Sequence, residues 1–141
     1  MKRILIVNGP NLNLLGSREP EVYGRQTMDD CLAALRRQYP ALTVDYYQSN
    51  VEGELINRLQ TAAGEVDGIL INAGGYSHTS VALHDCLKAI SVPAVEIHIS
   101  NLAQREAFRH VSLIAAACRG TIAGFGMDSY RLGVEALLKM E

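Results

Sequence analysis

The chain has 141 residues, of which 48% are hydrophobic and 20% are charged, and its formal net charge is −2 at pH 7. A chain of this length and composition can bury a sizeable core, which excludes an intrinsically disordered protein. The nearly neutral balance argues against a nucleic-acid partner or a membrane-surface partner, because such binders carry an excess of basic residues.

The start of the chain has the charge of a secretory signal but not its length. Two basic residues precede the apolar run Ile4–Val7, which is short of the roughly 7–15 residues that a signal peptide needs. No stretch reaches the roughly 20 apolar residues of a membrane span. Cys31, Cys86 and Cys118 are widely spaced and form no C-x-x-C pair. We therefore expect a cytoplasmic protein with reduced thiols.

Five segments have the composition of β-strands. They are Ile4–Asn8, Thr43–Gln48, Gly68–Asn72, Ala94–His98 and Thr121–Phe125. The third of them has no alternation of polar and apolar residues, which is typical of a strand that is covered on both faces.

Between these segments, apolar residues recur at helical spacing. The first helix is predicted to begin at Thr27, with Asp30 as its capping-box partner, and to end at Pro40. Three further helices are predicted around the apolar stripes of residues 55–63, 83–90 and 130–138, the second of them capped by Thr79 or Ser80. Residues 106–117 fit a short helix with irregular chain.

Strands that alternate with helices predict an α/β fold. We expect a flavodoxin-like open five-stranded parallel sheet with helices on both faces, in a single domain over residues 1–141. Ligands of such sheets bind beyond the carboxyl ends of the strands.

The loops expected at those ends carry most of the groups that can bind an anion. These groups are Asn11, Arg18, Tyr23, Asn72, His78, His98, Ser100, Arg105 and Arg109. Because the rest of the chain is nearly neutral, their gathering on one rim predicts a small anionic ligand.

Two pairs on this rim have spacing that suits acid–base chemistry. Glu96 and His98 lie two residues apart on a strand, so they face the same side, and a carboxylate stabilises the protonated form of an imidazole. Arg18 near Tyr23 would lower the pKa of the phenol by roughly 1–3 units, towards a usable base. From each pair alone, a purely structural role is the favoured interpretation.

Other site classes match the sequence less well. The segment "GGYSHTS" lacks the ending of a phosphate-binding P-loop, "GFGMDS" lacks the third glycine of a dinucleotide fingerprint, and no G-x-S-x-G elbow is present. His78, Asp85, Glu96 and His98 have no spacing that is typical of metal ligands, so no metal site is predicted.

Five blocks together resemble the type II 3-dehydroquinate dehydratases, or type II dehydroquinases, of the shikimate and quinate pathways. The blocks are "NGPNLNLLGSREPEVYG", "QSNVEGELINRLQ", "NAGGYSHTSVALHD", "VEIHISNLAQREAFR" and "GTIAGFGMDSYRLGVEAL". They cover essentially the whole chain in the family's order. The resemblance implies anti elimination of water from 3-dehydroquinate to give 3-dehydroshikimate through an enolate, without a metal or an organic cofactor.

The resemblance also implies roles for individual residues. Tyr23 matches the catalytic base, Arg18 the arginine that keeps it ionised, His98 the acid with Glu96 beside it, and Asn11 the residue of the water that steadies the enolate. The substrate-binding positions match Asn72, His78, Asp85, Ile99, Ser100 and Arg109, with backbone groups of Ile99 and Ser100 holding the carboxylate.

The same resemblance implies an assembly of trimers packed into a dodecamer, in which Asp85 reaches a neighbouring subunit's site. Residues 9–24 would then form a lid that brings Tyr23 over the substrate. The sequence departs from the family pattern at Val51, His84, Val111 and the pair Ala103-Gln104, none of which is a matched catalytic position.

Three interpretations other than a dehydratase remain. A purely structural, shell-forming role would leave Tyr23, Arg18 and His98 without a joint purpose. A flavodoxin-like module could hold flavin or another phosphate, but the loop after the first strand lacks the Ser/Thr-rich cradle of such modules. A receiver-type signalling domain needs acidic residues where this chain has Asn8 and Asn72.

Overall fold

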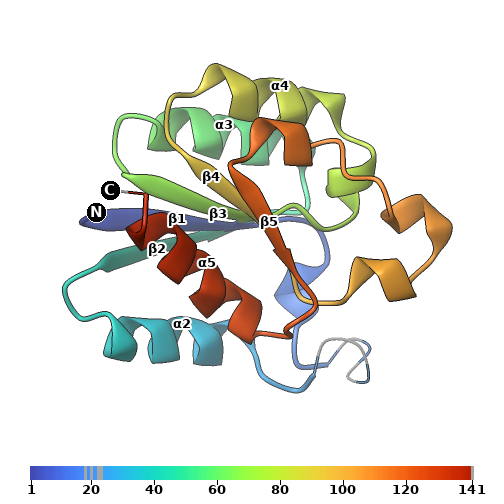
Figure 1. Ribbon diagram of the computed structural model, residues 1–141, viewed down its shortest axis with the longest axis horizontal. Coiled ribbons are helices and arrows are strands. Elements are labelled where there is room, and N and C mark those ends of the chain that lie inside the picture. Colours follow the sequence, from blue (N-terminus) through green and yellow to red (C-terminus); the bar gives the residue numbers. More distant parts are fainter. Residues whose placement is uncertain (18, 20, 22–23, 141) are drawn as a thin grey trace.

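The computed structural model describes residues 1–17, 19, 21 and 24–140. Its centre is a five-stranded sheet in the order β2-β1-β3-β4-β5 (Figure 1). The strands are β1 (Arg3–Asn8), β2 (Thr43–Gln48), β3 (Gly68–Asn72), β4 (Ala94–His98) and β5 (Gly120–Ala123). All four neighbouring pairs are parallel, so every strand ends at the same edge of the sheet.

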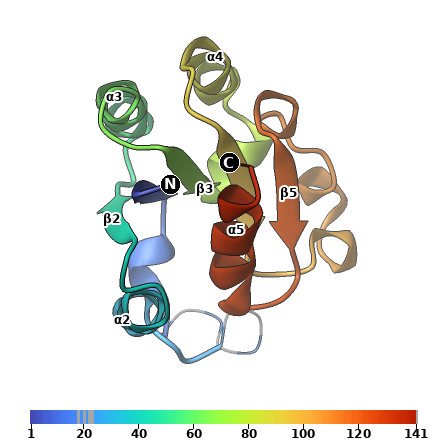
Figure 2. The same ribbon diagram turned by 60° about the vertical axis from the view of Figure 1, so that its left-hand side comes forward.

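Helices cover both faces of this sheet. Helices α2 (Met28–Gln38) and α5 (Asp128–Leu138) lie on one face, and α3 (Glu52–Ala62) and α4 (Val81–Ala89) lie on the other (Figures 1 and 2). Successive strand residues point to opposite faces. Ile4 and Ile6 of β1 therefore belong to the core under α2 and α5, whereas Leu5 and Val7 belong to the core under α3 and α4.

Side-chain caps fix where two of the helices begin. Thr27 Oγ1 accepts from the backbone N–H of Asp30, and the Asp30 carboxylate accepts from the backbone N–H of Thr27, which completes the predicted capping box. Ser80 Oγ accepts from the backbone N–H of Leu83 at the start of α4. Each cap supplies an acceptor for an amide that has no partner inside the helix.

The α/β class and the parallel sheet expected from the sequence are confirmed. The fifth strand was predicted to reach Phe125 but ends at Ala123, because Gly124 adopts a left-handed φ of 97° and turns the chain away from the sheet edge. Residues 106–117 hold two single-turn 3₁₀ helices, Ala107–Arg109 and Ala115–Ala117, joined by irregular chain.

The start of the chain and the end of α5 lie at the amino-terminal edge of the sheet. They are close together in both ribbon views, away from the carboxyl ends of the strands (Figures 1 and 2). No helix within the described residues combines the length and the apolar character of a membrane span.

Candidate active site

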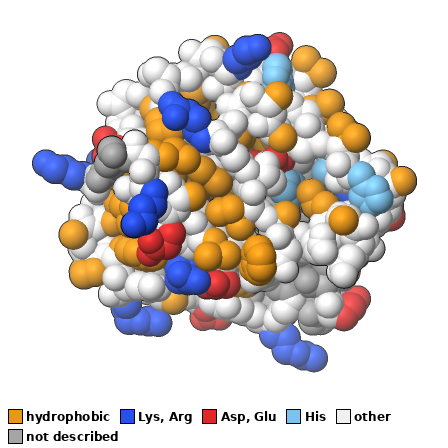
Figure 3. All heavy atoms as spheres, viewed as in Figure 1, with side chains coloured by type: hydrophobic (Ala, Val, Ile, Leu, Met, Phe, Trp, Pro, Cys, Tyr) orange, Lys and Arg blue, Asp and Glu red, His pale blue; other side chains and the backbone are white. Residues whose placement is uncertain are grey.

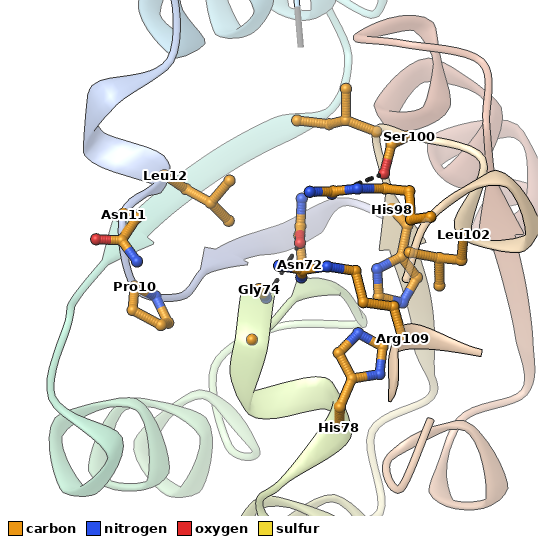
Figure 4. Close-up of a pocket in the computed structure, with 13 residues that line it drawn as sticks. Pro10, Asn11, Leu12, Asn72, Gly74, His78, His98, Ser100, Leu102 and Arg109 are labelled. Carbon is orange, nitrogen blue, oxygen red and sulfur yellow. Dashed lines mark hydrogen bonds between the residues drawn. The ribbon is translucent and has the colours of Figure 1, made fainter. Parts of the chain in front are cut away.

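A pocket lies at the carboxyl ends of the strands, between the loops that follow β1, β3 and β4 (Figure 4). Residues from these three loops line it: Pro10, Asn11, Leu12, Asn72, Gly74, Gly75, His78, His98, Ile99, Ser100, Leu102, Arg105 and Arg109. On the surface, histidine side chains gather on the side of the molecule where these loops lie (Figure 3).

Seven of the residues expected at the site line this one pocket: Asn11, Asn72, His78, His98, Ile99, Ser100 and Arg109. Glu96 is fully buried and contacts His98. Asp85 does not line the pocket; it lies on α4 with 72% of its side chain exposed, beside His84 Nδ1 at 3.2 Å. Arg18 and Tyr23 lie outside the described residues.

Glu96 and His98 form a buried pair, which confirms that they face the same side of β4. His98 Nε2 donates to Glu96 Oε2 at 2.8 Å; Glu96 is 0% exposed and His98 is 5% exposed. Glu96 Oε2 also accepts from Ser112 Oγ, and Glu96 Oε1 accepts from Thr121 Oγ1 at 2.8 Å. Burial alone would raise the pKa of Glu96, but donation from His98, Ser112 and Thr121 holds that pKa below its ordinary value.

These contacts define the state of both histidine rings. A carboxylate only accepts hydrogen bonds, so the proton of neutral His98 is on Nε2, and Nδ1 is the nitrogen that can exchange a proton with a ligand. His78 Nδ1 donates to the Val111 carbonyl at 2.8 Å, because a carbonyl oxygen cannot donate. The two rings stack with centroids 6.1 Å apart, so they present a joint imidazole surface to the pocket.

Two arginines bring positive charge to the pocket wall. Arg105 Nη1 donates to Ser100 Oγ at 3.2 Å, and Arg105 Nη2 lies 3.9 Å from Glu19 Oε2. Arg109 Nε is 3.1 Å from Glu106 Oε2. The sequence placed Arg105 on this rim but not among the substrate-binding residues. It lies between two short 3₁₀ helices, which have no apolar periodicity. The direction of its side chain therefore could not be predicted from the sequence.

The loop after β1 is held by polar contacts from the end of β2 and from the turn that follows it. The backbone N–H of Asn11 donates to Asn50 Oδ1 at 3.0 Å, and Gln48 Nε2 donates to the Gly9 carbonyl at 3.2 Å. Asn11 itself has a left-handed φ of 70°, a conformation that asparagine adopts more readily than most residues. Asn11 and His98, the last residue of β4, both line the pocket.

The described residues contain no group of three or more His, Cys, Asp or Glu side chains that could hold a metal ion. The arrangement is therefore one of imidazole, guanidinium, amide and backbone groups around a small polar hollow. Such groups bind an anion, donate protons and stabilise developing negative charge.

Comparisons with known proteins agree with one another. Residues 2–138 match the family model described as "Dehydroquinase class II". The 3-dehydroquinate dehydratase of Caldicellulosiruptor bescii is 49% identical over 140 residues, with 97% of each chain covered. That of Carboxydothermus hydrogenoformans is 52% identical over 138 residues, covering 96% of this chain and 90% of the relative.

Solved structures give the same result. The type II dehydroquinase of Butyrivibrio crossotus superposes with a TM-score of 0.93 at 39% identity, covering 96% of this chain and 97% of the other. The type II dehydroquinase of Propionibacterium acnes gives a TM-score of 0.90 at 40% identity, covering 99% of this chain and 96% of the other.

Proposed function

Because this chain belongs to the class II dehydroquinase family and is accordingly a hydro-lyase with 3-dehydroquinate dehydratase activity, we propose that it removes water from 3-dehydroquinate by anti elimination through an enolate. The observation that carries this mechanism is the buried Glu96–His98 pair at the wall of a pocket with two arginines. The pair could serve as the acid that protonates the departing hydroxyl, and the arginines could bind the carboxylate of the substrate.

His98 is the proposed general acid. When its ring is protonated, Nε2 stays bound to Glu96 and Nδ1 gives its proton to the hydroxyl that leaves the carbon β to the ketone. The Glu96 carboxylate lies against the ring and would offset the positive charge of the imidazolium inside the protein. A positioned acid of this kind contributes about 10²–10⁴-fold to a rate.

Tyr23 is the proposed base and Arg18 the group that keeps it ionised, on the strength of the family resemblance. The neighbouring described residues support a position near the pocket. Glu19 approaches Arg105, and Glu21 lines a hollow together with Ser100 and Arg105. A base on this segment would come from a different part of the chain than His98, which ends β4, so that the two could act on opposite faces of the substrate, as an anti elimination requires.

The remaining pocket residues are proposed to hold the substrate and its enolate. Backbone groups of Ile99 and Ser100 would bind the carboxylate, with Asn72, His78 and Arg109 around the ring. Asn11 would hold the water that stabilises the enolate oxygen. Fixed donors at such an oxygen are often the largest single contribution to catalysis.

Asp85 is proposed to act in a neighbouring subunit of a dodecamer built from trimers. Its place on α4, exposed and outside its own chain's pocket, supports that role. The sites of the assembly would then each combine residues of two chains.

The direct test is to mix the purified protein with 3-dehydroquinate and to follow the ultraviolet absorbance of the conjugated enone product. Substrate deuterated on one face of the ring then tests the anti geometry, because only the hydrogen opposite the departing hydroxyl should give an isotope effect. No enone at any protein concentration would overturn the proposed activity, and loss of the hydrogen on the hydroxyl's own face would overturn the anti course.

A pair of histidine variants tests the acid. His98→Asn should lower kcat by about 10²-fold or more. His110 is the matched control, because it is exposed and its Nε2 contacts only the Arg105 carbonyl among the hydrogen bonds that the structure gives it. His110→Asn should retain most of the activity. An unchanged kcat in His98→Asn would remove His98 as the acid.

A further inference from the structure

A chain of buried polar groups lies under the pocket floor, at the carboxyl ends of β1 and β3. Asn8 and Asn72 are register neighbours on these two strands. The hydroxyl of Tyr130, on α5, is hydrogen-bonded to both of them. Asn8 and Tyr130 are 0% exposed and Asn72 is 3% exposed. Among the three, only Asn72 lines the pocket.

The hydrogen bonds in this chain run in one direction. Asn72 Nδ2 donates to the Tyr130 hydroxyl at 3.0 Å, and that hydroxyl donates to Asn8 Oδ1 at 2.8 Å. At the other end of the same amide, Asn72 Oδ1 accepts from the backbone N–H of Gly74 at 3.2 Å, a contact drawn as a dashed line in Figure 4. The nitrogen and the oxygen of the Asn72 amide therefore each have a hydrogen-bond partner within the protein, which fixes the orientation of the amide.

The Tyr130 hydroxyl is well suited to this task. Burial holds the pKa of Tyr130 well above its ordinary value, so the group remains a neutral O–H that both donates and accepts. A buried amide without its partner would be costly in free energy, so it would turn to find another. Asn8, the register partner of Asn72 on the adjacent strand, carries another amide acceptor.

We propose that Tyr130 is a positioning residue for substrate recognition, which sets the orientation of the Asn72 amide without touching the substrate. This inference rests on the proposed function, in which Asn72 binds 3-dehydroquinate. With Tyr130 in place, Asn72 keeps one N–H and one lone pair for the ligand. Its bond to Gly74 also fixes the turn that leads to His78, since Gly74 begins the 3₁₀ helix Gly74–His78.

The test compares two tyrosine variants, each of which removes one hydroxyl that is hydrogen-bonded to Asn8. Tyr130→Phe removes the hydroxyl that binds both asparagines. Tyr46→Phe is the matched control, because Tyr46 accepts from Asn8 Nδ2 at 3.4 Å and has no hydrogen bond to Asn72. We expect Tyr130→Phe to raise KM about three- to tenfold, the factor of one neutral hydrogen bond, with kcat changed by less than about twofold. Tyr46→Phe should leave KM unchanged.

A double-mutant cycle separates positioning from general damage to the core. In the Asn72→Ala background, Tyr130→Phe should have no further effect on KM, because the group through which it acts is gone. A rise in KM of the same size in both backgrounds would overturn the inference, and so would an unchanged KM in Tyr130→Phe alone. If the wild-type protein does not convert 3-dehydroquinate, the proposed function fails before this comparison is reached.

A second variant serves if Tyr130→Phe does not fold. Asn8→Ala removes the acceptor that fixes the direction of the Tyr130 hydroxyl. It should raise KM in the Asn72 background and not in the Asn72→Ala background. An unchanged KM in folded Asn8→Ala would count against Tyr130 as a positioning residue.

Discussion

At the residue scale, Glu96 decides what His98 can do. Its carboxylate lies in a fully buried position, where it accepts hydrogen bonds from three side chains on different segments. Charge-assisted bonds of this kind are roughly twice as strong as neutral ones. Glu96 therefore stays ionised in spite of its burial, and the His98 ring is held by one nitrogen with the other left for proton transfer.

Replacing the carboxylate by an amide tests this arrangement. Glu96→Gln keeps the shape but loses the charge that offsets an imidazolium, so we expect kcat to fall by about tenfold or more with KM little changed. Steady-state kinetics across pH measures both constants. A matched change at the neighbouring donor, Thr121→Val, removes one hydrogen bond and leaves the charge, so it should cost much less. Equal losses in the two variants would contradict the charge argument.

The same carboxylate predicts how stability depends on pH. Because the pKa of Glu96 is lower in the folded protein than in the unfolded chain, the ionised group favours the folded state above the ordinary glutamate pKa of about 4.3. That contribution is lost as pH falls through the folded-state pKa. Denaturant unfolding at a series of acidic pH values should show the fall, and Glu96→Gln should show a shallower one. Parallel curves for the two proteins would contradict this prediction.

At the element scale, the pocket depends on two loops that approach closely. The backbone N–H of Gly9, after β1, donates to the Asn72 carbonyl at 2.8 Å. A Cβ at Gly9 would lie 2.4 Å from the Ala73 carbonyl oxygen, closer than non-bonded atoms can be. Only glycine therefore lets the loops after β1 and β3 meet, and both loops carry pocket residues.

Gly9→Ala should consequently harm stability and activity together. We expect a loss of about 1–3 kcal/mol in the free energy of unfolding, as for an overpacked site, and a lower kcat/KM. Gly53→Ala is the control, because a Cβ there meets nothing within 4 Å and the position lies within α3. It should stabilise the protein by up to about 1 kcal/mol. Denaturant titration of both variants measures these changes, and a neutral Gly9→Ala would contradict the close-approach argument.

Elements with strong local signals were predictable from the sequence. Apolar runs predict the buried strands, and a four-residue motif predicts the Thr27 cap. The two-residue period of a strand predicts that Glu96 and His98 face the same side. The partners Ser112 and Thr121 could not be predicted, since they come from distant segments and meet Glu96 only in the folded chain. Arg105 was predicted on the rim, but its place in the pocket wall was not, because successive 3₁₀ turns follow no period that indicates a buried or exposed face.

At the scale of the whole molecule, the proposed assembly makes each site depend on two chains. The protein should sediment as a particle of twelve 15.4 kDa chains. Asp85→Ala should lose activity even though the residue lies outside its own chain's pocket.

Mixing two inactive variants provides the sharper test. In particles refolded from Asp85→Ala and His98→Asn together, some sites combine an intact His98 with an intact Asp85 from the neighbouring chain. We therefore expect activity to return in the mixture and not in either variant alone. A mixture that assembles but stays inactive would contradict a shared site.

The placement of the chain ends also has a practical use. Because the start of the chain and the end of α5 lie close together at the edge of the sheet that is remote from the pocket (Figures 1 and 2), a purification tag or a surface tether that follows from either point would leave the mouth of the pocket unobstructed on its own protomer. A short linker could equally join these two points, with new termini in a surface turn. Such a circularly permuted protein should keep the same sheet.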